Sequence, residues 1–207
     1  MRLKSLLALL FGLFFAGALA AQTPAQVSVE PPAPTPDKIL HLDLSTGGRV
    51  TIQLRPDAAP RHVERIKTLT RQGFYNGLLF HRVIEGFMAQ TGDPTATGEG
   101  GSKLPDLAAE FNSLPHLRGT VSMARTSDPN SANSQFFIML TPRFSLDNKY
   151  TVFGRVTAGM NFVDAVEKGE PPLNPSRILR ASVGSDNVAP PAPGLAAPAV
   201  PQGTPQP

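Results

Sequence analysis

The sequence predicts a mainly-β domain, either a closed antiparallel barrel or a sandwich, with two helices covering its ends. Many short strand-like runs alternate with loops rich in glycine and proline, and only two segments have helical spacing. The chain of 207 residues has no cysteine, which excludes disulfides, thiolate metal sites and a cysteine nucleophile. A hydrophobic core must therefore hold the fold together, and closure of the sheet would also remove exposed strand edges.

The first two strands and the first helix are expected near the start of this domain. Residues 39–44 and 49–54 have strand-like composition, and the glycines between them favour a hairpin turn. A helix is expected from residue 57 or 58 to residue 72, because Pro60 is tolerated in a first turn and Gly73 is typical of a helix end. Apolar residues recur on roughly one face of this helix, at Val63, Ile66 and Leu69.

The rest of the domain is predicted to consist mostly of strands. Five candidates follow the first helix, at residues 78–84, 87–91, 119–124, 135–140 and 151–156. A second helix is expected over residues 160–168, where apolar side chains have helical spacing, and a last strand over residues 178–183. The longest connection, residues 92–110, is rich in glycine and proline.

The N-terminus has the pattern of an export signal. Arg2 and Lys4 precede an uninterrupted run of 14 apolar residues at 6–19, and the small residues Ala18 and Ala20 predict cleavage after Ala20. The run is shorter than the roughly 18 residues of a membrane-spanning helix. We therefore expect an exported protein, periplasmic or secreted. A membrane tether through an uncleaved signal is the alternative.

Two proline-rich segments, residues 21–36 and 189–207, flank a single domain at residues 37–188. Neither segment has an apolar period, so we interpret the first as a linker and the second as a disordered tail. A spacer through a cell envelope or a docking peptide is the alternative. The net charge is +3, and removal of residues 1–20 would leave 17 basic and 16 acidic side chains. This balance does not indicate nucleic-acid or membrane binding.

Several common site chemistries are not supported. The chain has four histidines, at His41, His62, His81 and His116. Their spacing is not that of metal ligands, so no metal site is expected. Residues 98–103 are rich in glycine but lack the spacing of a phosphate-binding loop, and we interpret them as a mobile surface loop. No serine has glycines two residues to either side, as a hydrolase nucleophile turn requires.

Residues 80–93, with the sequence FHRVIEGFMAQTGD, bring a cation, an amide and large apolar side chains close together. Strand alternation predicts three groups that each share a face: Phe80, Arg82 and Ile84; Met88 and Gln90; and Gln135, Phe137 and Met139. Composition alone favours a structural interpretation, in which Phe136, Ile138 and Leu140 build core and Arg82 pairs with an acid. A binding groove is the other interpretation.

Four ordered motifs resemble those of the cyclophilins, a class of peptidyl-prolyl cis-trans isomerases. They are FHRVIEGFMAQTGD at residues 80–93, GTVSMA at 119–124, NSQFFI at 133–138 and LDNKYTVFG at 146–154. The resemblance covers nearly all of residues 38–184. It implies a closed eight-stranded antiparallel barrel capped by two helices, with a packed interior and an active groove on the outer face. It also implies isomerase activity without a metal or cofactor.

The resemblance implies a role for each matching residue of the groove. Arg82 would donate a hydrogen bond to the prolyl nitrogen as the amide twists, while Gln90 and Gln135 would hydrogen-bond the substrate backbone or orient Arg82. The proline pocket would consist of Phe87, Met88, Phe137 and Leu146, with Tyr150 at its rim. The residue before proline would lie along Ala124, Arg125 and Thr126. Simple alternation separates Phe87 from Met88, and only the resemblance places both in one pocket.

The chain departs from the family pattern around this groove. Many members have Ala-Asn-Ala where this chain has Ala124, Arg125 and Thr126, and the loop at residues 127–130 has an extra residue. An indole that some members carry just before Leu-Asp is absent, and Tyr150 stands in place of a histidine of eukaryotic members. We expect retained isomerisation, an altered preference for the residue before proline, and weak binding of cyclosporin-type inhibitors.

The predicted function is therefore isomerisation of Xaa-Pro bonds in exported proteins. The expected partners are proline-containing peptides and unfolded exported proteins, with no nucleic acid and no stable membrane insertion once the signal is removed. We expect a monomer, because no exposed apolar helix face or heptad repeat is visible. Two alternatives are a non-catalytic peptide-binding or chaperone module that uses the same groove, and a structural envelope protein that acts through its proline-rich tails.

Overall fold

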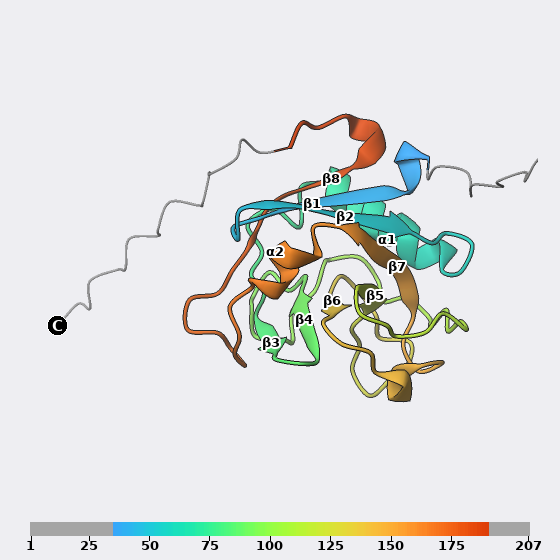
Figure 1. Ribbon diagram of the computed structural model, residues 1–207. Helices are drawn as coiled ribbons and strands as arrows, with labels where there is room; N and C mark the ends of the chain where they lie inside the picture. Colours follow the sequence, from blue (N-terminus) through green and yellow to red (C-terminus); the bar gives the residue numbers. More distant parts are fainter. Residues whose placement is uncertain (1–34, 191–207) are drawn as a thin grey trace, which may run out of the picture. The chain divides into compact units, whose positions relative to one another are not determined.

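The computed structural model describes residues 35–190, in which eight antiparallel strands form one curled sheet (Figure 1). The strand order is β3-β4-β6-β5-β7-β2-β1-β8. The predicted signal peptide at residues 1–20 lies outside the described residues, as do most of the linker and most of the C-terminal tail. Within the described part of the chain, no helix is both long and apolar enough to cross a membrane.

One half of the sheet is built around the predicted hairpin. Its strands are β1 (Ile39–Leu44), β2 (Gly48–Leu54), β7 (Val152–Ala158) and β8 (Ile178–Val183). β1 and β2 pair with each other, β8 adds to the free side of β1, and β7 adds to the free side of β2. Alternate residues of β2 are buried, at Val50, Ile52 and Leu54, as the period of two predicts.

The other half of the sheet contains three of the four motifs. Its strands are β3 (Arg82–Ile84), β4 (Met88–Thr91), β5 (Thr120–Met123) and β6 (Phe136–Met139). β4 lies between β3 and β6, so Gln90 stands opposite Arg82 on one side and opposite Phe137 on the other. This register brings residues from two separate motifs next to each other.

The sheet does not close into a barrel. No ladder joins the edge strands β3 and β8, and among the described residues isolated bridges cross the gap, from Leu79 to Arg177 and from Val83 to Gly169. The chain that enters β8 carries three prolines between residues 165 and 177, and proline has no N–H to donate to a ladder. The predicted mainly-β fold with two helices is confirmed, and the sheet is a curled half-barrel where a closed barrel was expected.

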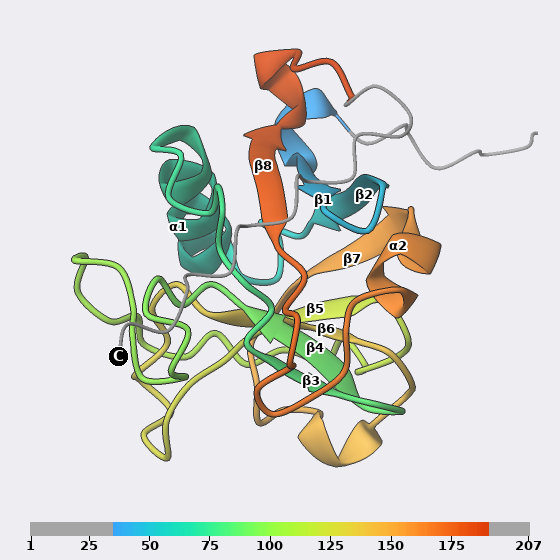
Figure 2. The same ribbon diagram turned by 90° about the vertical axis from the view of Figure 1, so that its left-hand side faces the viewer.

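Two α-helices of the described chain flank the sheet on opposite sides (Figure 2). α1 (Pro60–Arg71) begins later than expected, with Pro60 in its first turn, and buries Val63, Ile66 and Leu69. α2 (Met160–Asp164) ends earlier than the expected residue 168, and the ammonium of Lys168 donates to the carbonyls of Asp164 and Val166 at this end. Short 3₁₀ helices are η1 (Pro36–Lys38), η2 (Phe144–Leu146) and η3 (Gly184–Asp186).

The strand expected over residues 78–84 exists only from Arg82 onward. The backbone N–H of Phe80 donates to the carbonyl of Ser176 at 2.9 Å, outside any ladder, and the Phe80 ring is fully buried in the main core. Phe80 therefore does not share a face with Arg82 and Ile84, because the pleat that alternation assumes begins after it.

Phe136 and Phe137 point to opposite faces of β6 and separate two apolar clusters. Phe136 lies in the main core, where its ring makes edge contacts with Tyr75 and Phe153 at centroid distances of 5.5 and 6.0 Å. Phe137 belongs to a smaller cluster with Met88 and Met139 on the outer face of the sheet. The outer face therefore carries a second, nearly buried apolar surface.

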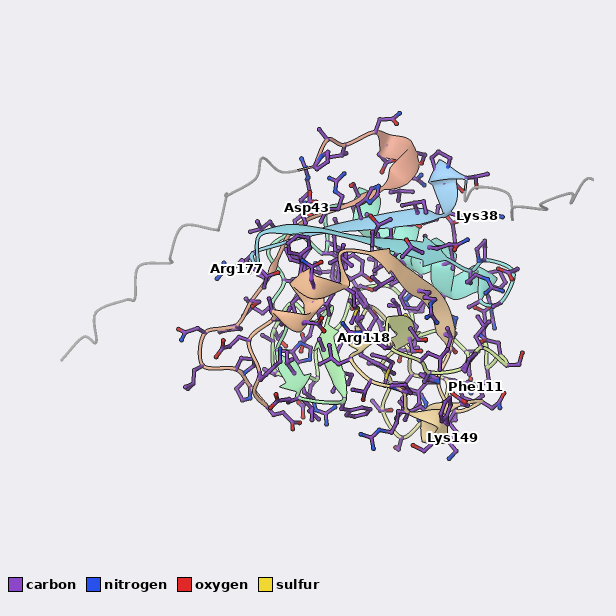
Figure 3. All side chains as sticks on the ribbon, viewed as in Figure 1. Lys38, Asp43, Phe111, Arg118, Lys149 and Arg177 are labelled. Atoms are coloured by element: carbon purple, nitrogen blue, oxygen red, sulfur yellow. The ribbon has the colours of Figure 1, made fainter. Side chains whose placement is uncertain are left out.

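The C-terminal end of the described chain is held against the first strand. Asp43 on β1 (labelled in Figure 3) is buried and accepts hydrogen bonds from both Arg49 and Arg180. The same two guanidinium groups donate to the carbonyls of Val188 and Ala189. The ordered contacts thus reach the position where the sequence predicts that the domain ends.

Two buried histidines make the stability of the fold sensitive to pH. Burial lowers the pKa of His62, although the carboxylate of Glu110, 2.6 Å from its Nδ1, acts in the opposite direction. Burial also lowers the pKa of His81, although Asp93 acts in the opposite direction. Neither ring nitrogen of His81 has a hydrogen-bond partner among the described residues.

We predict that the protein loses stability as the pH falls below about 6.5, the usual histidine pKa. A lowered pKa means that the folded state binds fewer protons than the unfolded state, so this contribution is complete above 6.5 and declines below it. Urea unfolding at pH 7.5 and pH 5.5 measures the effect, and His81→Asn should reduce the difference. Equal or greater stability at pH 5.5 would contradict the prediction.

Candidate functional site

A cavity of about 250 Å³ lies on the outer face of the β3–β4–β6 part of the sheet. Nine residues line it: Arg82, Phe87, Met88, Gln90, Ala124, Arg125, Phe137, Leu146 and Tyr150. All nine are site residues that the sequence predicts, and they come from four separate stretches of the chain. The fold therefore brings the motif residues together around one hollow.

The floor of this cavity is apolar and nearly buried. Met88 and Phe137 are 2% and 5% exposed, and both pack on the outer face with Met139. Tyr150 stands edge-on to Phe137 with a centroid distance of 5.6 Å. Such a floor fits a compact apolar ring and excludes water from it.

Phe87 reaches the same cavity because it precedes β4 and is not part of its pleat. It ends the turn at Gly86, which has a φ of 65°, and its N–H donates to the carbonyl of Ile84 at 3.0 Å. The guanidinium carbon of Arg143 lies 4.8 Å from the centre of the Phe87 ring. Phe87 and Met88 can therefore line one pocket although they are adjacent in the sequence.

A chain of amides forms the polar edge of the cavity. Gln135 uses its Nε2 to donate to the carbonyls of Gly98 and Gly100, at 2.9 and 2.8 Å. Its Oε1 accepts from Nε2 of Gln90 at 2.8 Å. This pattern fixes which way both amides point, because only the NH₂ groups can donate. The Oε1 of Gln90 is consequently left as an acceptor at the cavity.

Asp93 holds the loop that supplies these two carbonyls. Burial alone would raise the pKa of Asp93, but hydrogen bonds from Thr95 and from the N–H groups of Gly98 and Gly100 bring it below its usual value. Residues 98–103 are thus tied to the site, in contrast to the predicted mobile surface loop. This role of Asp93 is not predicted from the sequence, although Asp93 closes the longest motif.

Arg82 presents its guanidinium at the mouth of the cavity. Its Nε donates to Oε2 of Glu170 at 2.7 Å, and both side chains are nearly half exposed. Among the described residues, its two terminal nitrogens have no hydrogen-bond partner. Arg82 thus pairs with an acid and also lines the cavity, while its predicted catalytic role stays a prediction.

A second cavity of about 550 Å³ adjoins the first and shares Gln90, Ala124 and Arg125 with it. The predicted site residues Thr126 and Gln135 line this larger cavity and not the smaller one. Its walls also include the acidic residues Glu99 and Asp106, which are not among the predicted site residues. The three shared lining residues place the two cavities side by side.

Comparison with known proteins identifies the family. The sequence profile described as "Cyclophilin type peptidyl-prolyl cis-trans isomerase/CLD" matches residues 41–183. A protein from Brucella suis named "Probable peptidyl-prolyl cis-trans isomerase" is 45% identical over 193 residues, covering 84% of this chain and 98% of the relative. This chain belongs to the cyclophilin family.

Other cyclophilins support the assignment in sequence and in structure. "Peptidyl-prolyl cis-trans isomerase-like 1" of Aspergillus fumigatus is 41% identical over 145 residues, covering 66% of this chain and 89% of the relative. A cyclophilin crystal structure from Hirschia baltica has a TM-score of 0.68 and 33% identity, covering 73% of this chain and 75% of its own. One from Cryptosporidium parvum, determined in the presence of the dipeptide Ala-Pro, has a TM-score of 0.66 and 28% identity, covering 70% and 98%. The protein is a peptidyl-prolyl cis-trans isomerase.

Two departures of this cyclophilin from the family pattern are in contact with each other. The guanidinium carbon of Arg125 lies 4.6 Å from the centre of the Tyr150 ring. Arg125 also donates from Nε and from a terminal nitrogen to the carbonyl of Lys149, which is labelled in Figure 3. Arg125 therefore connects the two loops on either side of the groove and fixes Tyr150 at the rim.

The described part of this cyclophilin shows no gathering of acidic or histidine side chains that could hold a metal ion. His116 instead serves the packing around the groove. Its ring is buried, and the two ring nitrogens form hydrogen bonds with Asp147 and Ser122. The ring also stacks on Phe137 at a centroid distance of 6.3 Å.

We predict that Asp93→Asn loosens the polar edge of the groove. An amide keeps one acceptor oxygen but replaces the other with a donor that faces N–H groups, so the folded state should lose about 1–3 kcal/mol. Amide hydrogen exchange at Gly98 and Gly100 should accelerate more than exchange in β1. Unchanged protection of these two amides would show that Asp93 does not hold the loop.

Proposed function

We propose that this isomerase binds a proline ring on the floor of the smaller cavity and uses Arg82 to stabilise the twisted amide. The observation that carries the proposal is that the same cavity is lined by a nearly buried apolar floor and by a guanidinium whose terminal nitrogens have no hydrogen-bond partner among residues 35–190. A peptide could therefore place its ring on Met88 and Phe137 with its prolyl nitrogen facing Arg82.

The reaction requires no bond to be broken. Rotation about an Xaa-Pro bond crosses a barrier of about 18–20 kcal/mol and takes tens to hundreds of seconds without a catalyst. The protein needs only to bind the twisted state more tightly than either planar isomer. Twisting localises the lone pair on the prolyl nitrogen, and Arg82 can donate a hydrogen bond to it there.

Gln90 and Gln135 support this step by holding the substrate backbone. The fixed amide chain leaves Oε1 of Gln90 as an acceptor for a peptide N–H beside the twisting bond. The residue before proline would then lie along Ala124, Arg125 and Thr126 in the larger cavity. Leu146 and Tyr150 complete the wall around the proline ring.

We predict that Arg82→Ala lowers the catalytic efficiency by about a hundredfold, the effect of removing one preorganised donor. Arg82→Lys should restore little of it, because an ammonium cannot reproduce the planar fork of donors. Cis-trans exchange of a short Xaa-Pro peptide, followed by NMR, measures both variants. The proposed role of Arg82 would be wrong if the alanine variant kept wild-type activity. Binding without faster exchange in the wild type would favour a peptide-binding module.

We propose further that the substrates are exported proteins and that the isomerase acts as a monomer outside the cytoplasm, periplasmic or secreted, unless an uncleaved signal tethers it to a membrane. The export signal pattern at residues 1–20 motivates this assignment. Weak binding of cyclosporin-type inhibitors is proposed because Arg125 and Tyr150 change the rim and the indole is absent. Tight inhibition in a titration would contradict that part.

We predict that the mature protein begins at Ala21. Expression with the natural N-terminus in a bacterial host, followed by fractionation and intact mass measurement, tests this directly. The expected result is a mass lacking residues 1–20, in the periplasm or the medium. Full-length protein in the membrane fraction would support the tethered alternative, and full-length protein in the cytoplasm would contradict export.

A further inference from the structure

Glu170 is the one acidic side chain that contacts Arg82 among the described residues, and it is 88 positions away in the sequence. We propose that Glu170 is a positioning residue, which holds the guanidinium of Arg82 in the orientation that catalysis needs. The proposal rests on the proposed function of Arg82. Glu170 itself does not touch the twisting amide in this account.

The backbone fixes the place of Glu170 beside β3. Gly169 and Val83 exchange two hydrogen bonds, with N–H to carbonyl distances of 2.8 and 2.9 Å. The segment between α2 and β8 passes next to β3 in both ribbon views (Figures 1 and 2). Because Val83 follows Arg82 and Gly169 precedes Glu170, this bridge places the two charged side chains next to each other.

The bridge requires glycine at position 169. Its φ is 147°, and an added Cβ would stand 2.6 Å from the Cα of Pro172. No other residue fits this conformation without displacing backbone. The carboxylate of Glu170 is therefore carried on a segment whose path is sterically restricted, and not on a freely moving loop end.

The contact with Glu170 leaves the two terminal nitrogens of Arg82 available to a substrate. Within the described part of the chain only Nε is engaged, at 2.7 Å, so both terminal nitrogens can donate to a substrate. Arg118 on the same protein differs, because both of its terminal nitrogens donate to Asp164 or to a backbone carbonyl. An arginine side chain has several rotatable bonds, and anchoring it through Nε removes alternatives that do not reach the cavity.

The variants Glu170→Ala and Glu170→Gln test this role on the whole protein. We expect Glu170→Ala to lower the catalysed exchange rate about three- to fivefold, the size that an exposed ion pair supports. Glu170→Gln should lose less, because its amide oxygen can still accept from Nε. The effect should fall on kcat and not on KM, since the apolar floor that binds the ring is unchanged. Glu167→Ala is the matched control, because Glu167 is exposed and has no ion-pair partner among residues 35–190.

A double-mutant cycle distinguishes positioning from a general structural effect. If Glu170 acts through Arg82, then Glu170→Ala should change nothing further in an Arg82→Ala background. The Nε–H signal of Arg82 in NMR should also exchange faster with water in Glu170→Ala. Wild-type activity in Glu170→Ala, or an equal loss in both backgrounds, would overturn the proposal. A wild type that does not accelerate exchange would overturn the proposed function, while the Nε–H signal would still report the contact.

Discussion

Strand β6 is buried on both faces, and the site depends on this two-sided burial. Phe136 faces the main core and stabilises the sheet, while Phe137 faces outward and builds the floor of the groove. Each such ring contributes about 1.5–3 kcal/mol when it is removed from water. Because adjacent residues of a strand must point to opposite faces, anchoring Phe136 also fixes the position of Phe137. The position of the proposed proline-binding surface is thereby fixed by the packing of the core.

The polar half of the groove is organised by residues that do not line the smaller cavity. Asp93 holds the carbonyls that orient Gln135, and Gln135 in turn orients Gln90. Glu170 likewise holds Arg82, by accepting a hydrogen bond from its Nε. Both arrangements use buried or backbone-anchored groups to fix long side chains in advance, and in the proposed mechanism the twisted amide would meet donors and acceptors that are already in place.

The sequence predicts what depends on local pattern and motif. The β1–β2 hairpin, the buried face of α1 and the clustering of Arg82 with Phe137 all follow from alternation, helical spacing or family resemblance. Prediction from the sequence fails where contacts between segments far apart in the chain determine the structure. The gap between β3 and β8 follows from where a proline-containing segment lies, and Phe80 turns inward because it bonds to Ser176 and not to a strand. The partnership of Arg82 with Glu170 has no local signal at all.

In the proposed mechanism Arg82 acts on the twisted amide, while the apolar floor binds both planar isomers. NMR line-shape analysis of a saturable Xaa-Pro peptide separates the two, because it yields the dissociation constant and the exchange rate on the enzyme. For Arg82→Ala the account predicts a dissociation constant within about twofold of the wild type and an on-enzyme exchange rate lower by about a hundredfold. A dissociation constant that rises in proportion, with an unchanged on-enzyme rate, would show that Arg82 only binds the substrate and would contradict the account.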